Sequence, residues 1–233
     1  MVEHGDESRA ADPEVTRTPE MRAADGRVPG RRGLATRARL LKATADLIAS
    51  TGYRDVKVVD IARAVGTSPA TFYQYFADVE DAVLALSDEL LAEGPARLIE
   101  PLTTAEWHGR DALQACEDIA SAFLSFWSDY SALMAVIDLA VLEGDTRFRE
   151  RRTSLLNKFT VAATEVIEAQ KRAGFAPADM DSWASAVVLV SMLSHVAAHQ
   201  DGIIEWGVDP AELRRSMARV IYASVVGRTP LDD

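Results

Sequence analysis

From residue 36 onward, apolar residues recur along most of this chain at intervals of three and four, the spacing of one face of an α-helix. Leu41, Ala45 and Ile48 form such a stripe, and the alternating pattern typical of β-strands is nearly missing. We therefore expect an all-α fold. Glycine, proline and capping residues mark the breaks, and the expected helices cover about 36–51, 58–65, 69–75, 79–94, 110–128, 131–142, 146–173, 179–200 and 210–226.

Three regions follow from this pattern. Residues 1–33 are polar, contain several prolines and glycines and show no sustained apolar period, so they are expected to form a disordered tail that ends in a basic arm. Residues 34–80 are expected to form a small helical head, and residues 81–228 a larger helical domain.

The charge is distributed unevenly along the chain. The whole chain has a net charge of −11, which by itself argues against nucleic acid as a partner. Residues 27–76, however, hold nine Lys and Arg against three Asp and Glu, whereas residues 77–233 hold 13 against 26. Contact with a polyanion is therefore expected in the basic segment alone.

The expected compartment is the cytoplasm. A single cysteine, Cys116, excludes an internal disulfide framework and fits a reducing environment, and residues 1–33 show no apolar core of a signal peptide. The longest stretch without charged residues, 182–200, contains several serines and two histidines and has no basic anchor at either end. We read it as a buried helix, and we expect no membrane association.

A helix-turn-helix is indicated where the helices at 58–65 and 69–75 flank Gly66-Thr67-Ser68. Phe72 and Phe76 lie four residues apart and share the inward face of the third helix. The residues left pointing outward can approach base edges and phosphates, and they are Ala70, Thr71, Tyr73 and Gln74, with Tyr75 on the flank. The alternative is a compact helical hairpin whose aromatic residues only fill a core.

Residues 36–86 resemble the DNA-binding head of the tetracycline repressor (TetR) family. The resemblance rests on Leu40-Leu41, Gly52-Tyr53, Ile61-Ala62, Gly66-Thr67-Ser68, the run from Thr71 to Phe76, and Ala82-Val83-Leu84. It implies an all-helical homodimer with N-terminal three-helix DNA-reading heads and a variable C-terminal domain that holds a small molecule. Dimerisation in that family uses the last two long helices, here 179–200 and 210–226. The implied DNA-contacting residues are Arg37, Lys57, Thr67, Ser68, Pro69, Ala70, Thr71, Tyr73, Gln74 and Tyr75.

Two positions depart from the family pattern. Lys57 stands where a Thr or Ser usually caps the second helix, and Val79 stands where a Lys is common. Val79 is surrounded by acids that would repel a nearby phosphate. We expect the missing positive charge to come from Arg27, Arg31, Arg32, Arg37 and Arg39.

Aromatic and apolar helices between residues 107 and 183 suit a small apolar ligand held by one or two hydrogen bonds. The candidate ligand-binding residues are Trp107, Phe123, Trp127, Met134, Asp138, Asn157, Phe159 and Trp183. For each of them ordinary core packing is an alternative, and Asp138 either orients a ligand or sits at a solvated edge.

Neither a metal site nor an enzyme is expected. His195 and His199 share one helical face but lack a third ligand at a suitable spacing, so packing or an interface hydrogen bond is the better interpretation. Cys116 is expected to serve core packing rather than redox sensing. Enzyme motifs are missing, and no cofactor is expected. The sequence thus favours a ligand-responsive transcriptional repressor of palindromic operator DNA, and the alternative is a helical small-molecule-binding protein that has lost affinity for DNA.

Overall fold

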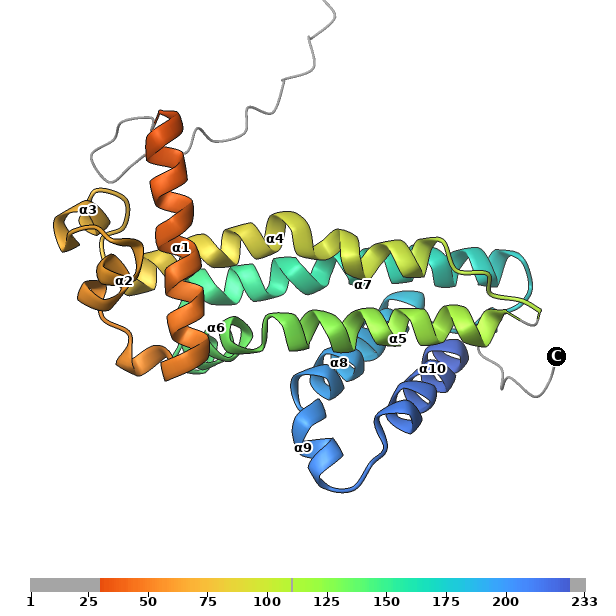
Figure 1. The fold of residues 1–233 in the computed structure, drawn as a ribbon. Helices are drawn as coiled ribbons and strands as arrows, with labels where there is room; N and C mark the ends of the chain where they lie inside the picture. Colours follow the sequence, from red (N-terminus) through yellow and green to blue (C-terminus); the bar gives the residue numbers. More distant parts are fainter. Residues whose placement is uncertain (1–29, 110, 227–233) are drawn as a thin grey trace, which may run out of the picture.

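The computed structural model describes residues 30–109 and 111–226, and within these ranges every regular element is helical (Figure 1). The all-α expectation is therefore confirmed. A short 3-10 turn, Tyr53–Asp55, follows the first helix. The helices are α1 (Arg31–Thr51), α2 (Val58–Val65), α3 (Pro69–Tyr73), α4 (Val79–Thr103), α5 (Ala112–Asp129), α6 (Ser131–Leu142), α7 (Thr146–Arg172), α8 (Ser182–Ala198), α9 (Gln200–Glu205) and α10 (Pro210–Val226).

The start of the first helix differs from the expectation. The tail was expected to extend to residue 33, whereas α1 already begins at Arg31. Leu34 donates its backbone N–H to the carbonyl of Gly30 at 3.0 Å, which closes the first turn. The rest of the expected tail, Arg27 included, lies outside the described residues.

A small head and a longer body make up the molecule (Figure 1). Helices α1 to α3 form the head at one end, and α4, α5 and α7 run along the body with α8 and α10 packed beside α5 and α7. Helix α4 belongs to both parts, because Ala82 packs in the head core while Val83 and Leu84 pack in the body core. The expected boundary between residues 80 and 81 therefore falls inside a helix that the two parts share.

Side-chain caps begin several of these helices. Asp145 accepts a hydrogen bond from the amide of Arg147 at 2.8 Å, and Asp209 accepts from the amides of Ala211 and Glu212. These carboxylates occupy positions where the first amides of a helix have no intrahelical partner, and both were expected from the sequence. At the other end of a helix, Gly66 has a φ of 73°, the left-handed conformation that ends α2.

Helix α4 continues through Gly94 and Pro95 to Thr103, so the expected end near these residues is wrong. Gly94 serves a different purpose, because a Cβ atom placed there would lie only 2.8 Å from Cε2 of Phe126. The glycine lets α4 approach α5 closely. Pro95 lacks an N–H group, but the helix is buried at this point and its packing on both sides holds it together.

Two further properties of the body bear on function. In the described ranges no single helix is both long and apolar enough to cross a bilayer, and α5 and α6 meet that test only as a pair bent by 81°. Burial raises the pKa of the Cys116 thiol to about 12. Because the reactive form of cysteine is the thiolate, this residue acts in packing, as expected, and not in redox sensing.

Replacing Gly94 with alanine tests the close contact between α4 and α5. The added methyl group meets the buried ring of Phe126, and overpacking of this kind costs about 1–3 kcal/mol, more than the roughly 1 kcal/mol that alanine gains over glycine in a helix. We expect Gly94→Ala to lower the free energy of unfolding, measured by urea denaturation at fixed protein concentration.

Gly202→Ala is the matched control, because a Cβ atom at that helical position meets no atom within 4 Å. The control should leave stability unchanged or raise it slightly. A Gly94→Ala protein as stable as the parent would contradict the packing described above.

Candidate nucleic-acid interface

Helix α3 lies at the outer end of the head, and two buried aromatic rings fix its orientation (Figure 1). Phe72 and Phe76 are fully buried with ring centroids 5.4 Å apart, and they pack in a core with Leu40, Leu41 and Ile61. Burial of each ring contributes roughly 2–3 kcal/mol. The inward face of α3 is thus set by strong apolar packing, and the opposite face must point outward.

The outward face carries the side chains that the sequence predicted there. Tyr73 is 53% exposed, Gln74 and Ala70 are exposed, and Thr71 and Tyr75 are half-buried. Within the described part of the chain, the Tyr73 hydroxyl and the Gln74 amide have no hydrogen-bond partner. These two polar groups are therefore available to an external partner.

Ser68 and Thr71 first serve the helix itself. Ser68 Oγ accepts from the amide of Thr71 at 3.3 Å and lies 3.1 Å from the Thr71 hydroxyl. Pro69 follows at the first helical position, where a missing N–H is harmless. This local arrangement starts α3 immediately after the turn at Gly66 and Thr67. It leaves Ser68 and Pro69 exposed beside the outward face of α3.

Two of the arginines expected to contact phosphates have other partners. The guanidinium of Arg37 lies 5.2 Å from the centroid of the Phe76 ring, and its Nη1 is 3.5 Å from Glu89 of α4. Arg39 donates to the carbonyl of Val65 at the end of α2. Both side chains thus contact other parts of the molecule, and their role as phosphate contacts stays a prediction.

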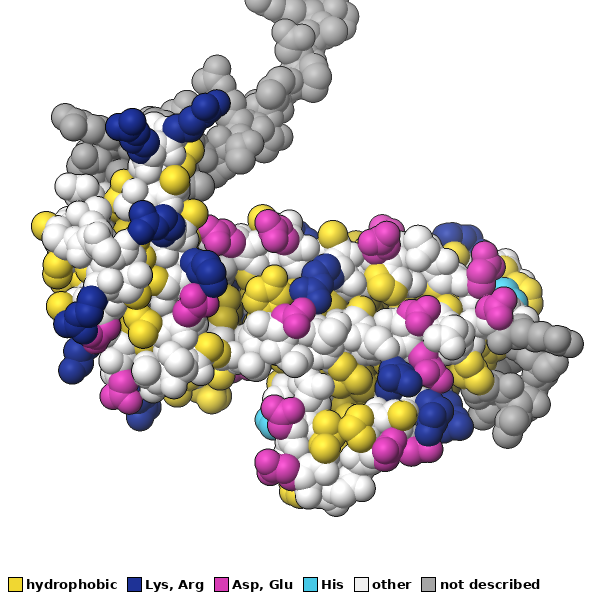
Figure 2. All heavy atoms as spheres, viewed as in Figure 1, with side chains coloured by type: hydrophobic (Ala, Val, Ile, Leu, Met, Phe, Trp, Pro, Cys, Tyr) yellow, Lys and Arg dark blue, Asp and Glu magenta, His cyan; other side chains and the backbone are white. Residues whose placement is uncertain are grey.

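The remaining cations of the head are accessible. Arg31 and Arg32 are exposed at the start of α1, and Lys57 is exposed directly before α2. Lys57 has no ion pair among the residues that the structure describes. Figure 2 shows Lys and Arg side chains spread over α1 and the outer head, while Asp and Glu are more frequent along the body.

The acids near the start of α4 have local partners. Asp78 accepts from the amide of Asp81 at 2.8 Å, and Asp81 accepts from the amide of Ala77 at 3.0 Å. Glu80 pairs with Arg147 of α7. Negative charge at a helix N-terminus is favourable, so this cluster begins α4 and ties it to the body.

Most of the expected ligand residues belong to a filled core. Phe123 and Phe159 pack edge to face with centroids 4.8 Å apart, and Trp107 is buried in the same core. Asn157 and Trp183 are exposed, and the structure does not bring them together with the buried rings. Asn157 lies on the solvent side of α7, and Trp183 lies on a side of α8 that also exposes Val187.

Trp127, Met134 and Asp138 do share a pocket, of about 250 Å³, with residues 197–201 at the junction of α8 and α9. Asp138 is paired there with Arg152, at 2.6 Å. The indole nitrogen of Trp127 is a buried donor without a partner among the described residues. An unsatisfied buried N–H costs about 1–3 kcal/mol, and a ligand with an acceptor atom would recover it.

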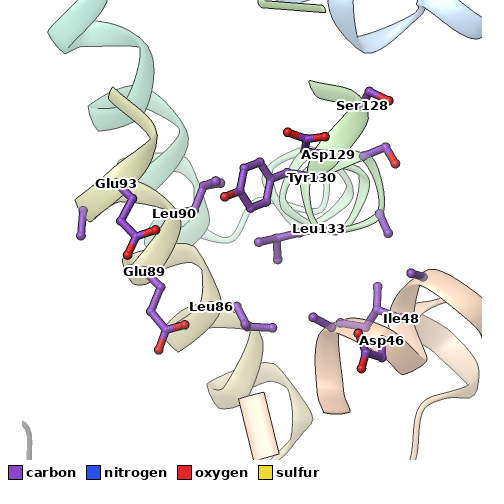
Figure 3. A pocket seen from close by; sticks show the side chains of 15 residues that line it. Asp46, Ile48, Leu86, Glu89, Leu90, Glu93, Ser128, Asp129, Tyr130 and Leu133 are labelled. Carbon is purple, nitrogen blue, oxygen red and sulfur yellow. The ribbon is translucent and has the colours of Figure 1, made fainter. Parts of the chain in front are cut away.

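A larger hollow, of about 540 Å³, lies between the head and the body and was not predicted from the sequence (Figure 3). It is bounded by α1, α4 and the junction of α5 and α6, with Leu86, Leu90 and Leu133 among its apolar residues. The signal that could have indicated it is the pair Glu89 and Glu93, two carboxylates one turn apart on α4.

His195 and His199 stack with ring centroids 4.3 Å apart, and His199 Nδ1 lies 2.9 Å from the carbonyl of His195. The described ranges contain no group of three or more His, Cys, Asp or Glu side chains placed to hold a metal ion. The two rings therefore pack against each other at the end of α8.

Two family models match the chain. Residues 40–86 match the model described as bacterial regulatory proteins, tetR family, and residues 98–232 match the tetracyclin repressor-like C-terminal domain. The first match covers most of α1 to α3 and the start of α4. The second covers most of the body.

Curated relatives span nearly the same length. The HTH-type transcriptional regulator EthR of Mycolicibacterium smegmatis is 24% identical over 220 residues, which is 93% of this chain and 99% of the relative. The HTH-type transcriptional regulator YdgC of Bacillus subtilis is 25% identical over 208 residues, which is 85% of this chain and 95% of the relative.

Solved structures share the fold. The fatty acid degradation regulator FadR from Bacillus halodurans has a TM-score of 0.62 and 18% identity, covering 84% of this chain and 97% of that one. The regulator FadR from Bacillus subtilis, in complex with stearoyl-CoA, has a TM-score of 0.61 and 18% identity, covering 82% and 98%.

The different positions of Arg37 and Lys57 lead to a prediction about stability. We expect Arg37→Gln to lower the free energy of unfolding by about 1 kcal/mol, because it removes a cation–π contact and an ion pair from a side chain that is only 16% exposed. Lys57→Gln should change it by less than about 0.5 kcal/mol. Urea denaturation followed by circular dichroism measures both, and equal losses would contradict the assignment.

Proposed function

The chain belongs to the tetracycline repressor (TetR) family of bacterial regulatory proteins, and from this premise we propose a ligand-responsive transcriptional repressor that binds palindromic operator DNA as a dimer. The observation that carries the proposal is the face of α3, where Tyr73 and Gln74 project outward while Phe72 and Phe76 are buried. Both curated relatives are described as HTH-type transcriptional regulators, YdgC as an uncharacterized one. Repression and ligand response are the parts proposed for this chain.

In the proposed complex, α3 enters the major groove. Ala70 leaves room for the helix to approach the base edges, and Tyr73 and Gln74 offer a hydroxyl and an amide to bases or phosphates. Thr67, Ser68 and Lys57 lie beside this face and are proposed to contact the phosphate backbone. Because phosphate contacts dominate affinity, binding should weaken steeply as salt is raised.

The proposed dimer forms through α8 and α10, which contact each other in the structure. Trp183 is 50% exposed and Val188 is 68% exposed on α8, and Val187 and Val220 add further exposed apolar surface. A contiguous apolar surface of this kind is typical of an interface. A twofold dimer would bury it and would present two heads to successive major grooves.

The proposed ligand site is the pocket that contains Trp127, Met134 and Asp138. Its lining is mixed: Trp127, Met134 and three alanines give it an apolar side, and Asp138, Gln200 and several other polar residues line the rest. The indole N–H of Trp127 is a donor that a ligand acceptor could satisfy. The complex of a structural relative with stearoyl-CoA shows that this fold can hold a molecule with a long apolar chain. We propose a small apolar ligand that carries at least one acceptor atom.

Ligand binding is proposed to change the spacing of the two heads. Couplings between two sites are typically about 1–3 kcal/mol, which corresponds to a weakening of DNA binding by roughly 5- to 150-fold. The bound ligand shifts the dimer toward a head spacing that no longer fits two successive major grooves.

The test is to select genomic DNA fragments with the purified protein. We expect enrichment of a palindrome whose half-sites lie roughly 34–36 Å apart, or a multiple of that spacing. Gln74→Ala should weaken binding to the enriched site by about 1–3 kcal/mol. Gln114→Ala, which removes an exposed amide on α5, should leave binding unchanged. Selection without an enriched palindrome would overturn the repressor, and tight small-molecule binding without any DNA footprint would favour the alternative of a binding protein.

The dimer leads to a separate prediction. Val188→Asp places a charge in the proposed interface, where its desolvation is costly, and we expect the protein to sediment as a monomer at micromolar concentration. Leu142→Asp changes an even more exposed apolar residue, at the end of α6, and should leave the dimer intact. If the parent protein is itself a monomer, or if both variants behave alike, the proposed interface is wrong.

A further inference from the structure

The hollow between head and body has a distinct chemical character (Figure 3). Tyr130 and Leu133 project from the junction of α5 and α6 toward Leu90 and Leu86 of α4, which gives the hollow an apolar wall. Apart from this wall, the lining includes four carboxylates, and it contains no Lys or Arg. These carboxylates are Asp46, Glu89, Glu93 and Asp129.

Three of the four carboxylates are paired with cations from outside the lining. Asp46 pairs with Lys42, Glu89 with Arg37 and Asp129 with Arg97. Glu93 has no ion pair within the described ranges. It lies one helical turn from Glu89, and two like charges at this spacing repel each other. Arg97 lies one turn further along α4, where it pairs with Asp129 and lies over the ring of Tyr130. The hollow therefore holds one carboxylate without an ion pair, beside an apolar wall.

We propose that this hollow binds a small organic cation with an apolar body, such as an ammonium group attached to an aromatic or alkyl group. The cation would pair with Glu93, because the ring of Tyr130 already has the guanidinium of Arg97 over it, 5.9 Å from its centroid. The apolar body would cover Leu86, Leu90 and Leu133. A volume of about 540 Å³ is within the range of ordinary ligand sites.

The position of Arg37 connects this site to the DNA-reading helix, and this step rests on the function proposed above. Arg37 pairs with Glu89 at the edge of the hollow and lies over Phe76, one of the two rings that orient α3. A cation bound beside Glu89 and Glu93 competes with Arg37 for the carboxylate. Release of Arg37 removes a contact that holds Phe76, so occupancy of the hollow lowers affinity for DNA.

Three probes that share one apolar body test the charge requirement. They are para-phenylbenzylamine, a cation at neutral pH, the neutral para-phenylbenzyl alcohol and the anion para-phenylbenzoate. Titration calorimetry with the full-length protein should show the amine binding at least about threefold more tightly than the alcohol, because a partly exposed ion pair contributes up to about 1 kcal/mol. The benzoate should bind most weakly. Equal binding of all three, preference for the benzoate or no binding of the amine overturns the proposal.

Matched variants locate the site. Glu93→Gln should weaken amine binding about threefold and leave alcohol binding unchanged, and Ala92→Phe should block the hollow and weaken both about tenfold or more. The controls are Glu100→Gln and Ala96→Phe, which alter exposed residues of the same helix that do not line the hollow. Amine binding that is insensitive to Glu93→Gln and Ala92→Phe, or equally sensitive to the controls, overturns the assignment.

A DNA-binding measurement separates this proposal from the function on which its last step rests. At saturating amine, affinity for the selected DNA should fall about fivefold or more, and Ala92→Phe should abolish this response. Amine binding without any change in DNA affinity overturns the coupling through Arg37 while the cation site stands. A protein that binds no DNA at all overturns the proposed repressor function. The calorimetric titrations then test the cation site on their own.

Discussion

Burial of Phe72 and Phe76 against α1, α2 and the start of α4 is the interaction on which the functional reading depends. A helix as short as α3 has little stability of its own, because the first turn of any helix is costly to form. The two rings supply that stability through packing, and they fix which side chains face away from the head. The outward position of Tyr73 and Gln74 is thus a consequence of what lies underneath them.

Helix α4 transmits this arrangement to the rest of the molecule. Its first turns complete the head core, and its later turns pack against α5 and α7 in the body. Arg151 makes a two-pronged ion pair with Asp88, at 2.8 and 3.0 Å, which joins α7 to α4. Since one continuous helix takes part in both cores, a displacement of α4 in the body would also displace the core of the head.

The helical fold and the outward face of α3 could be predicted from the sequence, because both depend on local periodicity and on caps such as Ser68 and Asp145. It failed where contacts are distant in sequence. Gly94 resembled a helix end, and only the ring of Phe126, 32 residues later, explains it. Arg37 and Arg39 resembled free cations, yet Glu89, Phe76 and Val65 hold them. The hollow beside Glu93 is bounded by three separate segments, and the pair Glu89 and Glu93 is a local pattern for only one of them.

The abrupt bend between α5 and α6 has a mechanical consequence. Only Tyr130 separates the two helices, and their axes differ in direction by 81°. Helix α6 contacts α1, whereas α5 packs against α8 and α10. A displacement of α5 along its own axis would therefore reach α1 through a helix that runs nearly at right angles to α5. The bend makes α6 the link by which a shift at the far end of the body would act on the side of α1 rather than along its axis.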